Sequence, residues 1–349
     1  MDNNKKIFLY DSKPYDQEAF DQANKKHGFD IQYFNGHLNH NTACLSKGSD
    51  AVCAFVNDTI DKPVVEVLKE CNIGLIALRS AGYNNVDLKA AYGTIHVARV
   101  PGYSPYAVAE HASALLLSLN RKTHKAYHRT REGNFSINGL IGFDLHAKTA
   151  GVIGTGKIGR CLISILKGFG MKVLAYDVYP DEEYAEASGI SYTDLPELYA
   201  KSDIISLHCP LNKDTYHLID NQSINQMKPG VFLINTGRGG LVKTQDLIEG
   251  LKSGKIGAAG LDVYEEESEY FFEDFSASMI SDDILARLLT FPNVLITSHQ
   301  GFFTKEALSN IAETTLANIK EYFEGGFLKN EICYRCDKQC CKKQKQRCF

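Results

Sequence analysis

The stretch Gly151-Val152-Ile153-Gly154-Thr155-Gly156-Lys157-Ile158-Gly159 lies in the middle of this 349-residue chain. The apolar run at 148–153 predicts a buried strand before it. In the Gly-x-Gly-x-x-Gly pattern, the first glycine permits a tight turn, the second lets backbone approach a pyrophosphate, and the third lets a helix pack closely on the sheet. The pattern therefore predicts a strand, a turn and a helix whose N-terminus can receive phosphate groups.

Asp177 closes the next apolar run, at 172–176. A carboxylate about twenty residues after the glycine pattern can accept hydrogen bonds from a ribose 2′-hydroxyl. It would repel a 2′-phosphate. We therefore expect a dinucleotide cofactor here, and NAD in preference to NADP.

Apolar runs alternate with polar, helix-compatible stretches on both sides of the glycine pattern. Before it they lie at 6–10, 31–34, 51–56, 73–78 and 95–100, and from it onward at 150–153, 172–176, 203–208, 231–235, 257–261 and 293–297. Such runs are typical of parallel sheets covered by helices on both faces. The sequence thus predicts an α/β protein with a small first domain and a doubly wound, six-stranded second domain.

Two helices complete the predicted organisation. Ser104 and Pro105 indicate a helix start, and the apolar spacing continues to about Leu116. Residues 122–146 have poor periodicity, so we expect a loop with some helix. Residues 304–324 have apolar positions at helical spacing, and we expect this last helix to cross back to the first domain with no strand after it.

The composition is that of an ordinary globular protein with a formal net charge of −4. The body of the chain has no long basic stripe, which argues against nucleic-acid binding. The apolar run near the N-terminus is too short for a secretory signal, and no run approaches the roughly 18 apolar residues of a membrane span. We expect a cytoplasmic protein without membrane contact.

The cysteines fall into two groups. Five lie in apolar or mixed sequence and are interpreted as small core residues: Cys44, Cys53, Cys71, Cys161 and Cys209. Five more, Cys333, Cys336, Cys340, Cys341 and Cys348, lie among lysines and an arginine near the C-terminus. Cys333, Cys336, Cys340 and Cys341 could present four thiolates to zinc or an iron–sulfur cluster. No second His/Cys knuckle completes a standard motif, so we favour a tail without a bound metal.

Polar residues follow three of the predicted strands of the second domain. Arg238 comes after the run at 231–235, Asp262 and Glu267 after 257–261, and His299 after 293–297. Ligands of open α/β sheets bind outside the carboxyl ends of the strands, where these residues should meet. An arginine can bind a substrate carboxylate, a histidine can protonate a keto oxygen, and a carboxylate can orient and charge that histidine. This set predicts hydride chemistry on a 2-keto acid.

With these residues the chain resembles the D-isomer-specific 2-hydroxyacid dehydrogenases, most closely their fermentative, NAD-dependent D-lactate group. The resemblance covers about 6–330 and includes Arg79-Ser80-Ala81-Gly82-Tyr83-Asn84-Asn85-Val86-Asp87 and Ser298-His299-Gln300. Further family-like stretches lie at 100–105, 151–159, 205–211, 235–239 and 260–267, and 270–274 resembles an insert of the lactate group. Gly102 and Gly237 depart from the residues common in the family, and the tail after Asn330 lies outside its pattern.

The resemblance implies roles for individual residues. Arg238, Glu267 and His299 match the catalytic residues, and Ala81, Gly82, Tyr103, Arg238 and His299 match the substrate-binding ones. Cofactor contacts are implied for Gly154, Thr155, Gly156, Lys157, Ile158, Gly159, Asp177, Cys209, Pro210, Thr236, Gly237, Arg238 and Asp262.

The resemblance also implies two Rossmann-like doubly wound parallel-sheet domains, one flavodoxin-like and binding substrate, the other binding NAD. The substrate domain is discontinuous, at 1–102 and 301–332; the NAD-binding domain spans 103–300, and 333–349 is a Cys/Lys-rich tail. Homodimers are usual in the family.

The implied reaction is the reversible reduction of pyruvate to D-lactate by NADH. One alternative is a bulkier 2-keto acid, such as phenylpyruvate or 4-methyl-2-oxopentanoate, depending on the packing near Tyr83, Tyr103 and Phe302. A second alternative is an NADH-responsive binding protein, similar to the corepressor branch of the family.

Overall fold

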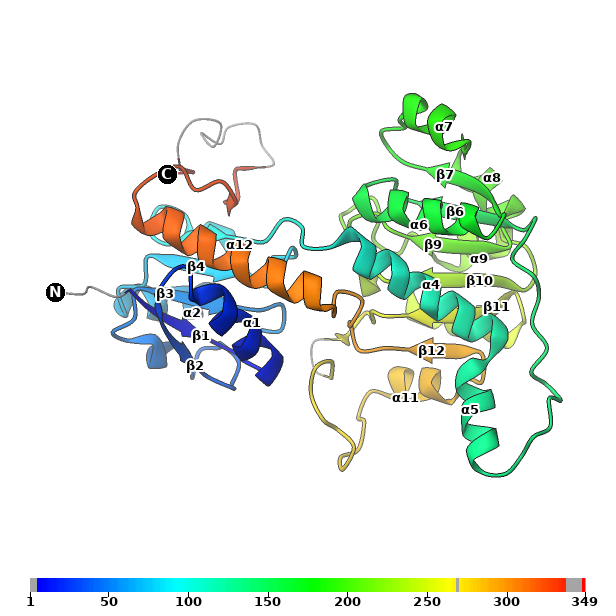
Figure 1. Ribbon diagram of the computed structural model, residues 1–349, viewed down its shortest axis with the longest axis horizontal. Coiled ribbons are helices and arrows are strands. Elements are labelled where there is room, and N and C mark those ends of the chain that lie inside the picture. Colours follow the sequence, from blue (N-terminus) through cyan, green and yellow to red (C-terminus); the bar gives the residue numbers. More distant parts are fainter. Residues whose placement is uncertain (1–4, 268–269, 337–346, 349) are drawn as a thin grey trace. The chain divides into compact units, whose positions relative to one another are not determined.

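The computed structural model describes residues 5–267, 270–336 and 347–348. The chain forms two compact units, Met1–Ser104 with Phe303–Phe349, and Pro105–Phe302. Each contains a sheet flanked by helices (Figure 1). The predicted α/β class with two parallel-sheet domains is confirmed. Within the described part of the chain, no helix combines the length and the apolar character that a membrane span requires.

The first unit contains a six-stranded sheet in the order β13-β5-β4-β3-β1-β2. Its strands are β1 (Lys6–Leu9), β2 (Asp30–Tyr33), β3 (Ala51–Ala54), β4 (Leu75–Leu78), β5 (His96–Ala98) and β13 (Glu331–Ile332). Its helices are α1 (Pro14–Asn24), η1 (Ala43–Ser46), α2 (Lys62–Glu70), α3 (Leu88–Ala91) and α12 (Lys305–Phe323). Helices α1 and α12 lie side by side (Figure 1) and cover one face of the sheet, while α2 covers the other.

Strand β13 corrects the expectation that no strand follows the last helix. It is two residues long and pairs antiparallel with β5, joining Glu331 to Ala98 and Ile332 to Val97. So short a strand, beginning with a glutamate, has no apolar run from which it could be predicted. It ties the end of the chain to the edge of the first sheet.

The second unit contains a seven-stranded parallel sheet in the order β12-β11-β10-β9-β6-β7-β8. Its strands are β6 (Thr149–Ile153), β7 (Lys172–Tyr176), β8 (Ser191–Tyr192), β9 (Ile204–Leu207), β10 (Val231–Asn235), β11 (Ile256–Leu261) and β12 (Val294–Ile296). Its helices are α4 (Pro105–Arg121), α5 (Thr123–Arg131), α6 (Lys157–Gly168), α7 (Glu182–Ser188), α8 (Leu195–Lys201), α9 (Asn221–Gln226), η2 (Gly239–Leu241), α10 (Thr244–Lys252) and α11 (Asp283–Thr290). The short edge strand β8 adds to the six predicted strands.

Separate hydrophobic clusters cover the two faces of the second sheet. Helices α4 and α6 pack together (Figure 1), and their buried residues join one cluster. Helices α9 and α10 contribute to the other. Because both faces are covered, ligands can reach this sheet only at the strand ends.

The prediction for the dispersed cysteines is partly wrong. Cys53 and Cys71 are buried, but Cys44 is exposed and Cys161 and Cys209 are partly exposed. In the short helix η1 the inward positions are taken by Ala43 and Ser46, which leaves Cys44 facing outward.

Candidate active site

The glycine pattern forms the turn between β6 and α6, and its glycines meet different surroundings. Gly154 has a φ of 98°, and a Cβ there would lie 2.6 Å from the backbone nitrogen of Cys209. A Cβ on Gly159 would lie 2.0 Å from the carbonyl oxygen of Gly154. Both positions therefore need glycine for the fold itself, as predicted for a tight turn and a close helix contact.

Gly156 differs because a Cβ there would meet no atom within 4 Å. It is exposed and precedes the first turn of α6, whose amide groups have no partners within the helix. Nothing in the described chain requires a bare backbone at this position, whereas a closely approaching pyrophosphate does. The loop therefore fits a dinucleotide.

Asp177, at the end of β7, is tied to the glycine loop. Its Oδ2 accepts hydrogen bonds from the Thr155 amide at 2.7 Å and the Thr155 hydroxyl at 3.0 Å, and its Oδ1 accepts one from the Tyr179 amide at 3.0 Å. Burial by itself would raise the pKa of Asp177, but these donors outweigh it and hold the pKa below its ordinary value. The carboxylate stays charged and holds the loop. Val178 and Tyr179, which sequence reasoning did not single out, are exposed beside it.

The other predicted cofactor contacts follow β9 and β10. Cys209 and Pro210 come after β9, and burial raises the pKa of the Cys209 thiol to about 11, so the side chain is neutral. Thr236 follows β10, and its hydroxyl oxygen is buried without a hydrogen-bond partner among the described residues. A buried polar atom without a partner is costly, and a ligand group can satisfy it.

The pairing register of strands β10, β11 and β12 places the three predicted catalytic residues beyond neighbouring strand ends. Asn235 of β10 pairs with Leu261 of β11, and Leu261 pairs with Ile296 of β12. Arg238 follows Asn235 in the chain, Glu267 follows Leu261, and His299 follows Ile296. Parallel pairing thus sends all three segments out at the same edge of the sheet.

The segment that carries Arg238 is shaped by Asn235 and Gly239. The Asn235 side chain accepts a hydrogen bond from the Gly237 amide at 3.1 Å and donates one to the Arg238 carbonyl at 2.9 Å. A Cβ on Gly239 would lie 2.0 Å from the carbonyl oxygen of Tyr264, so only glycine lets this segment pack against the one leading to Glu267. Sequence reasoning assigned no role to Asn235 and expected the glycines of this loop to leave room for backbone near a ligand, whereas Gly239 makes room for a neighbouring segment of the protein.

Arg238 itself is partly buried, and its Nη1 donates to the carbonyl of Gly237 at 2.7 Å. No ion pair to a carboxylate of the described residues is formed by this guanidinium. Its positive charge and remaining donors are therefore available to an anionic ligand.

Glu267 and His299 form a bonded pair. Glu267 Oε1 lies 2.8 Å from His299 Nδ1, and Glu267 Oε2 accepts a hydrogen bond from the Tyr264 amide at 3.0 Å. Both side chains are about one-fifth exposed, 18% for His299 and 22% for Glu267. With Nδ1 engaged by a carboxylate, Nε2 is the ring nitrogen left for proton transfer.

Asp262 is almost fully buried and organises the segment around His299. Its Oδ1 accepts from the Thr297 hydroxyl at 2.6 Å and the Gln300 amide at 2.9 Å, and its Oδ2 accepts from the Gly301 amide at 2.7 Å. His299 adopts a left-handed φ of 55°, and its amide donates to the Asp262 carbonyl at 2.7 Å. The carboxylate therefore holds a strained turn that presents the histidine.

The predicted substrate-side residues belong to the first unit. Ala81 and Gly82 follow β4 in a turn where Ser80 Oγ donates to the Gly82 carbonyl at 2.8 Å and Arg99 donates to the Ala81 carbonyl at 2.7 Å. The carbonyl of Tyr103 accepts a hydrogen bond from Asn310 on α12 at 2.7 Å.

An apolar side chain missed by sequence reasoning lies next to the catalytic pair. The rings of Phe272 and His299 have centroids 6.0 Å apart, and Phe272 lies 6.5 Å from Phe302. Phe272 has a positive φ of 70° and lies within the segment resembling the lactate-group insert.

A dinucleotide-type loop together with an acid–histidine pair and an arginine at adjacent strand ends defines a nicotinamide-dependent oxidoreductase. Residues 113–301 match the NAD-binding domain of the D-isomer specific 2-hydroxyacid dehydrogenases. D-lactate dehydrogenase of Escherichia coli K12 is 50% identical over 328 residues, which are 94% of this chain and 99% of that protein.

Solved structures agree with these sequence matches. The apo-structure of the E. coli D-lactate dehydrogenase superposes with a TM-score of 0.87 at 48% identity, covering 94% of this chain and 99% of that one. The pyruvate reductase of Chlamydomonas reinhardtii superposes with a TM-score of 0.89 at 44% identity, covering 94% and 98%. The chain belongs to the D-isomer specific 2-hydroxyacid dehydrogenase family, and its cofactor is NAD.

Proposed function

We propose that this enzyme reduces pyruvate to D-lactate reversibly with NADH. The observation that carries the proposal is the Glu267–His299 pair at 2.8 Å, on strand ends next to an arginine without a carboxylate partner among the described residues. The names of the relatives, D-lactate dehydrogenase and pyruvate reductase, favour the same substrate.

In this proposal bound NADH supplies a hydride to the keto carbon. His299 Nε2 gives a proton to the keto oxygen, so that one hydride and one proton convert the carbonyl to a hydroxyl. Glu267 keeps the proton of Nδ1 in place and stabilises the imidazolium before the transfer. In the reverse direction neutral His299 accepts the proton from the lactate hydroxyl.

Arg238 binds the anionic substrate through its planar donors, and the amides of Ala81 and Gly82 bind the substrate carboxylate with Tyr103 beside them. We assign residues 1–102 and 301–332 to the substrate domain and 103–300 to the NAD-binding domain; these predicted boundaries lie two residues from those of the two compact units, which place Tyr103 in the first unit. The cofactor contacts are those implied by the resemblance: Gly154, Thr155, Gly156, Lys157, Ile158, Gly159, Asp177, Cys209, Pro210, Thr236, Gly237, Arg238 and Asp262. Asp262 and Thr155 also hold the loops in which they lie, Asp262 through its hydrogen bond from the Gly301 amide and Thr155 through its amide hydrogen bond to Asp177.

A small substrate is favoured by the aromatic ring beside the catalytic histidine. The ring centroid of Phe272 lies 6.0 Å from that of His299, and its aromatic surface would limit the space for a substrate side chain beside the histidine. A methyl group fits such a boundary more readily than the benzyl group of phenylpyruvate. The bulkier 2-keto acids remain the second candidate substrate class.

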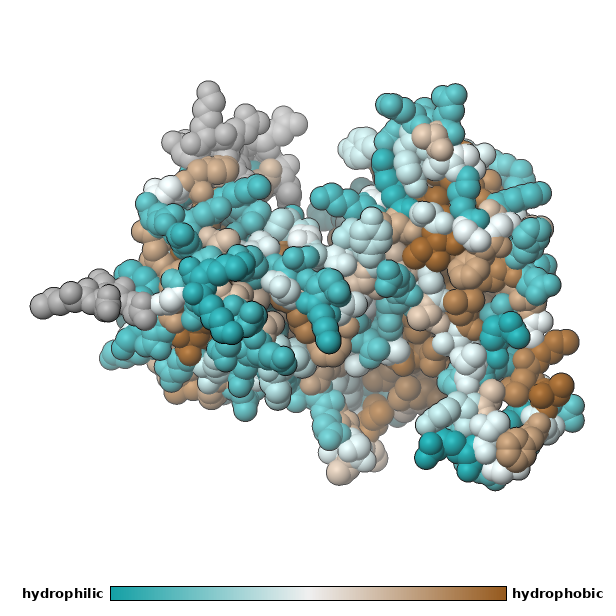
Figure 2. Space-filling model, viewed as in Figure 1, coloured by the Kyte–Doolittle hydropathy of each residue, from teal (hydrophilic) through white to brown (hydrophobic). Residues whose placement is uncertain are grey.

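We further propose a cytoplasmic homodimer. Figure 2 shows hydrophobic side chains gathered at the edge of the second unit, over the segment that follows α5. Phe135, Ile137 and Ile141 of this segment are 77%, 81% and 85% exposed. Such a patch is typical of a protein interface. Sedimentation analysis of Ile137→Glu should show monomers if this segment joins two copies, and an unchanged species would contradict it.

The deciding experiment measures NADH oxidation with a panel of 2-keto acids and determines the chirality of the product. We expect the highest kcat/KM with pyruvate and formation of the D isomer. His299→Ala should lower turnover by ~10²–10⁴ through loss of the general acid while NADH binding is retained. Cofactor binding without turnover on any keto acid would instead support the NADH-responsive binding protein.

A further inference from the structure

Three cysteines of the C-terminal tail come together beside β13. Cys333 follows the strand directly, Cys336 lies three residues on, and Cys348 returns to them near the end of the chain. The Sγ of Cys336 lies 3.8 Å from that of Cys333 and 3.9 Å from that of Cys348, and all three sulfurs lie within 4.8 Å of one another. Cys340 and Cys341, the other members of the four-thiolate set considered from the sequence, lie outside the described residues.

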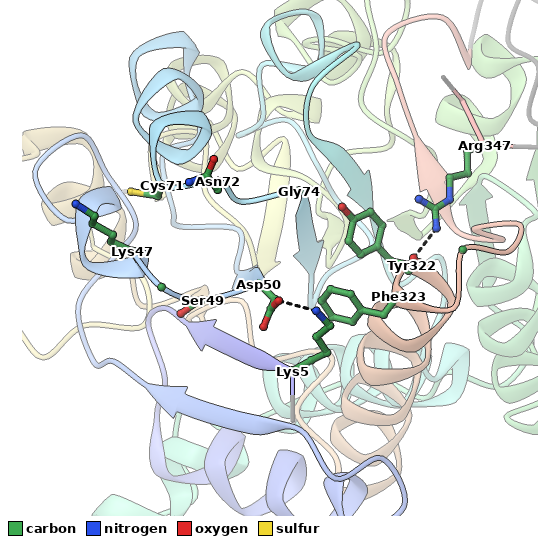
Figure 3. Close-up of a pocket in the computed structure, with 12 residues that line it drawn as sticks. Lys5, Lys47, Ser49, Asp50, Cys71, Asn72, Gly74, Tyr322, Phe323 and Arg347 are labelled. Carbon is green, nitrogen blue, oxygen red and sulfur yellow. Dashed lines mark hydrogen bonds and ion pairs between the residues drawn. The ribbon is translucent and has the colours of Figure 1, made fainter. Parts of the chain in front are cut away.

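Hydrogen bonds that do not involve the sulfurs hold Cys348 near Cys333 and Cys336. Buried Glu331 of β13 accepts a hydrogen bond from the Cys348 amide at 2.6 Å through Oε2, and its Oε1 lies 2.5 Å from Nδ1 of His96 on β5. Arg347 donates to the Tyr322 carbonyl at the end of α12, and Figure 3 shows its guanidinium extended toward that residue. The neighbouring β13, β5 and α12 therefore fix the backbone on both sides of the cluster.

The sulfur spacing fits a shared metal ion. A disulfide needs sulfurs about 2.05 Å apart, far closer than these. A tetrahedral Zn²⁺ with Zn–S bonds of about 2.3 Å holds its thiolates about 3.8 Å apart. An iron–sulfur cluster distributes its thiolates over several irons, which this compact group of three does not match.

A backbone donor and two arginines accompany these cysteines. The Cys333 amide donates a hydrogen bond to Cys336 Sγ at 3.2 Å. Arg335, whose guanidinium lies over the ring of Tyr92 at 4.6 Å, precedes Cys336 directly, and Arg347 precedes Cys348 directly.

We propose that Cys333, Cys336 and Cys348 form a structural Zn²⁺ site that fastens the tail to the edge of the first sheet. Each thiol loses its proton as the ion binds, and a fourth, exchangeable ligand completes the tetrahedron. Cys348 was absent from the set predicted from sequence because it is separated from Cys336 by residues 337–347. The hydrogen bonds of its amide to Glu331 and of Arg347 to Tyr322 bring it back.

The test uses the full-length protein purified without chelator and then desalted. Metal analysis should find about one zinc per chain, with Cys336→Ser and Cys348→Ser each lowering occupancy about tenfold or more. Cys44→Ser is the matched control, because Cys44 is exposed in the same unit and outside the cluster, and it should leave occupancy unchanged. NADH binding and pyruvate reduction should persist in all three variants, which shows that each one folds.

A second measurement needs no variant. Addition of Co²⁺ to the metal-free protein should produce a thiolate-to-cobalt charge-transfer band, and Zn²⁺ should remove it. Mass spectrometry should find Cys333, Cys336 and Cys348 protected from alkylation until a chelator is added. The proposal is overturned by protein that retains no zinc and gives no cobalt band, by undiminished zinc in Cys348→Ser, or by a Cys336–Cys348 disulfide in the protein as purified without chelator.

Discussion

Replacing Glu267 with glutamine tests the acid–histidine pair because both oxygens of this carboxylate face N–H donors. Oε1 lies 2.8 Å from His299 Nδ1, and Oε2 accepts from the Tyr264 amide at 3.0 Å. A glutamine amide has one oxygen and can serve only one of these donors. The Tyr264 amide is fixed in the backbone, whereas an imidazole can change tautomer, so we expect the glutamine oxygen to face Tyr264 and its NH₂ to face His299.

That arrangement makes Nδ1 an acceptor and places the ring proton on Nε2. His299 then loses its charge-assisted hydrogen bond to the carboxylate, and its Nε2, which already carries a proton, cannot accept one from lactate. Loss of one charge-assisted hydrogen bond costs about 1.5–3 kcal/mol, or roughly 10–150-fold in rate. If the histidine is also held in the wrong tautomer, the decrease in rate can reach about 10⁴-fold. We therefore expect Glu267→Gln to lower kcat by ~10³–10⁴ in both directions.

The assay is steady-state NADH oxidation with pyruvate and NAD⁺ reduction with D-lactate, together with NADH titration by fluorescence. The NADH dissociation constant should stay within about threefold of the parent, since no cofactor contact is removed. Glu266→Gln is the matched control, because Glu266 is exposed and has the same chemistry. A fall of less than about tenfold in both directions would refute the tautomer argument.

Three further predictions follow from single contacts. Arg238→Lys keeps the charge but loses the planar fork, so kcat/KM for pyruvate should fall about 10–100-fold, and an unchanged value would argue against substrate binding by this residue. Asp177→Ala removes a carboxylate that repels a 2′-phosphate, so the ratio of kcat/KM for NADH to that for NADPH should fall about tenfold or more. A constant ratio would contradict the binding of the cofactor's ribose by Asp177. Burial raises the pKa of Asp58 to about 6 although two backbone amides donate to it, so the folded state holds this proton more tightly than the unfolded state. The free energy of unfolding should therefore decrease by about 2–3 kcal/mol as the pH rises from about 4 to 6, measured by urea titration. In Asp58→Asn this dependence on pH should disappear. The variant should also be about 1–3 kcal/mol less stable at low pH, because one buried backbone amide loses its acceptor.

The strand pattern and the glycine pattern could be read from the sequence because both are local. Apolar runs predicted most strands, and the spacing of Gly154 and Gly159 predicted the turn and close helix contact found at these positions. The two-residue strands β8 and β13 were missed, since each contains too few residues to show any periodicity. Their existence depends on a neighbouring strand that provides a free edge.

Residue types at the candidate site were also predictable, but their contacts were not. Arg238, Glu267 and His299 were singled out because they follow apolar runs. The bond between Glu267 and His299 depends on the register of β11 against β12 and on the turn that Asp262 holds. Asn235 and Gly239 lie in a stretch that resembles the family, but the close packing of Gly239 against Tyr264 could not be predicted because it depends on a neighbouring segment.

The amino-acid sequence by itself determined the α/β class, the cofactor loop and the chemical groups at the strand ends, since these follow from periodicity, spacing and residue type over short stretches. Only the tertiary structure decided which groups meet. Glu267 reaches His299 across two strand ends, and Cys348 reaches Cys333 and Cys336 through the buried carboxylate of Glu331. Such encounters depend on strand register and on buried hydrogen bonds between segments far apart in the chain, and no local pattern encodes them.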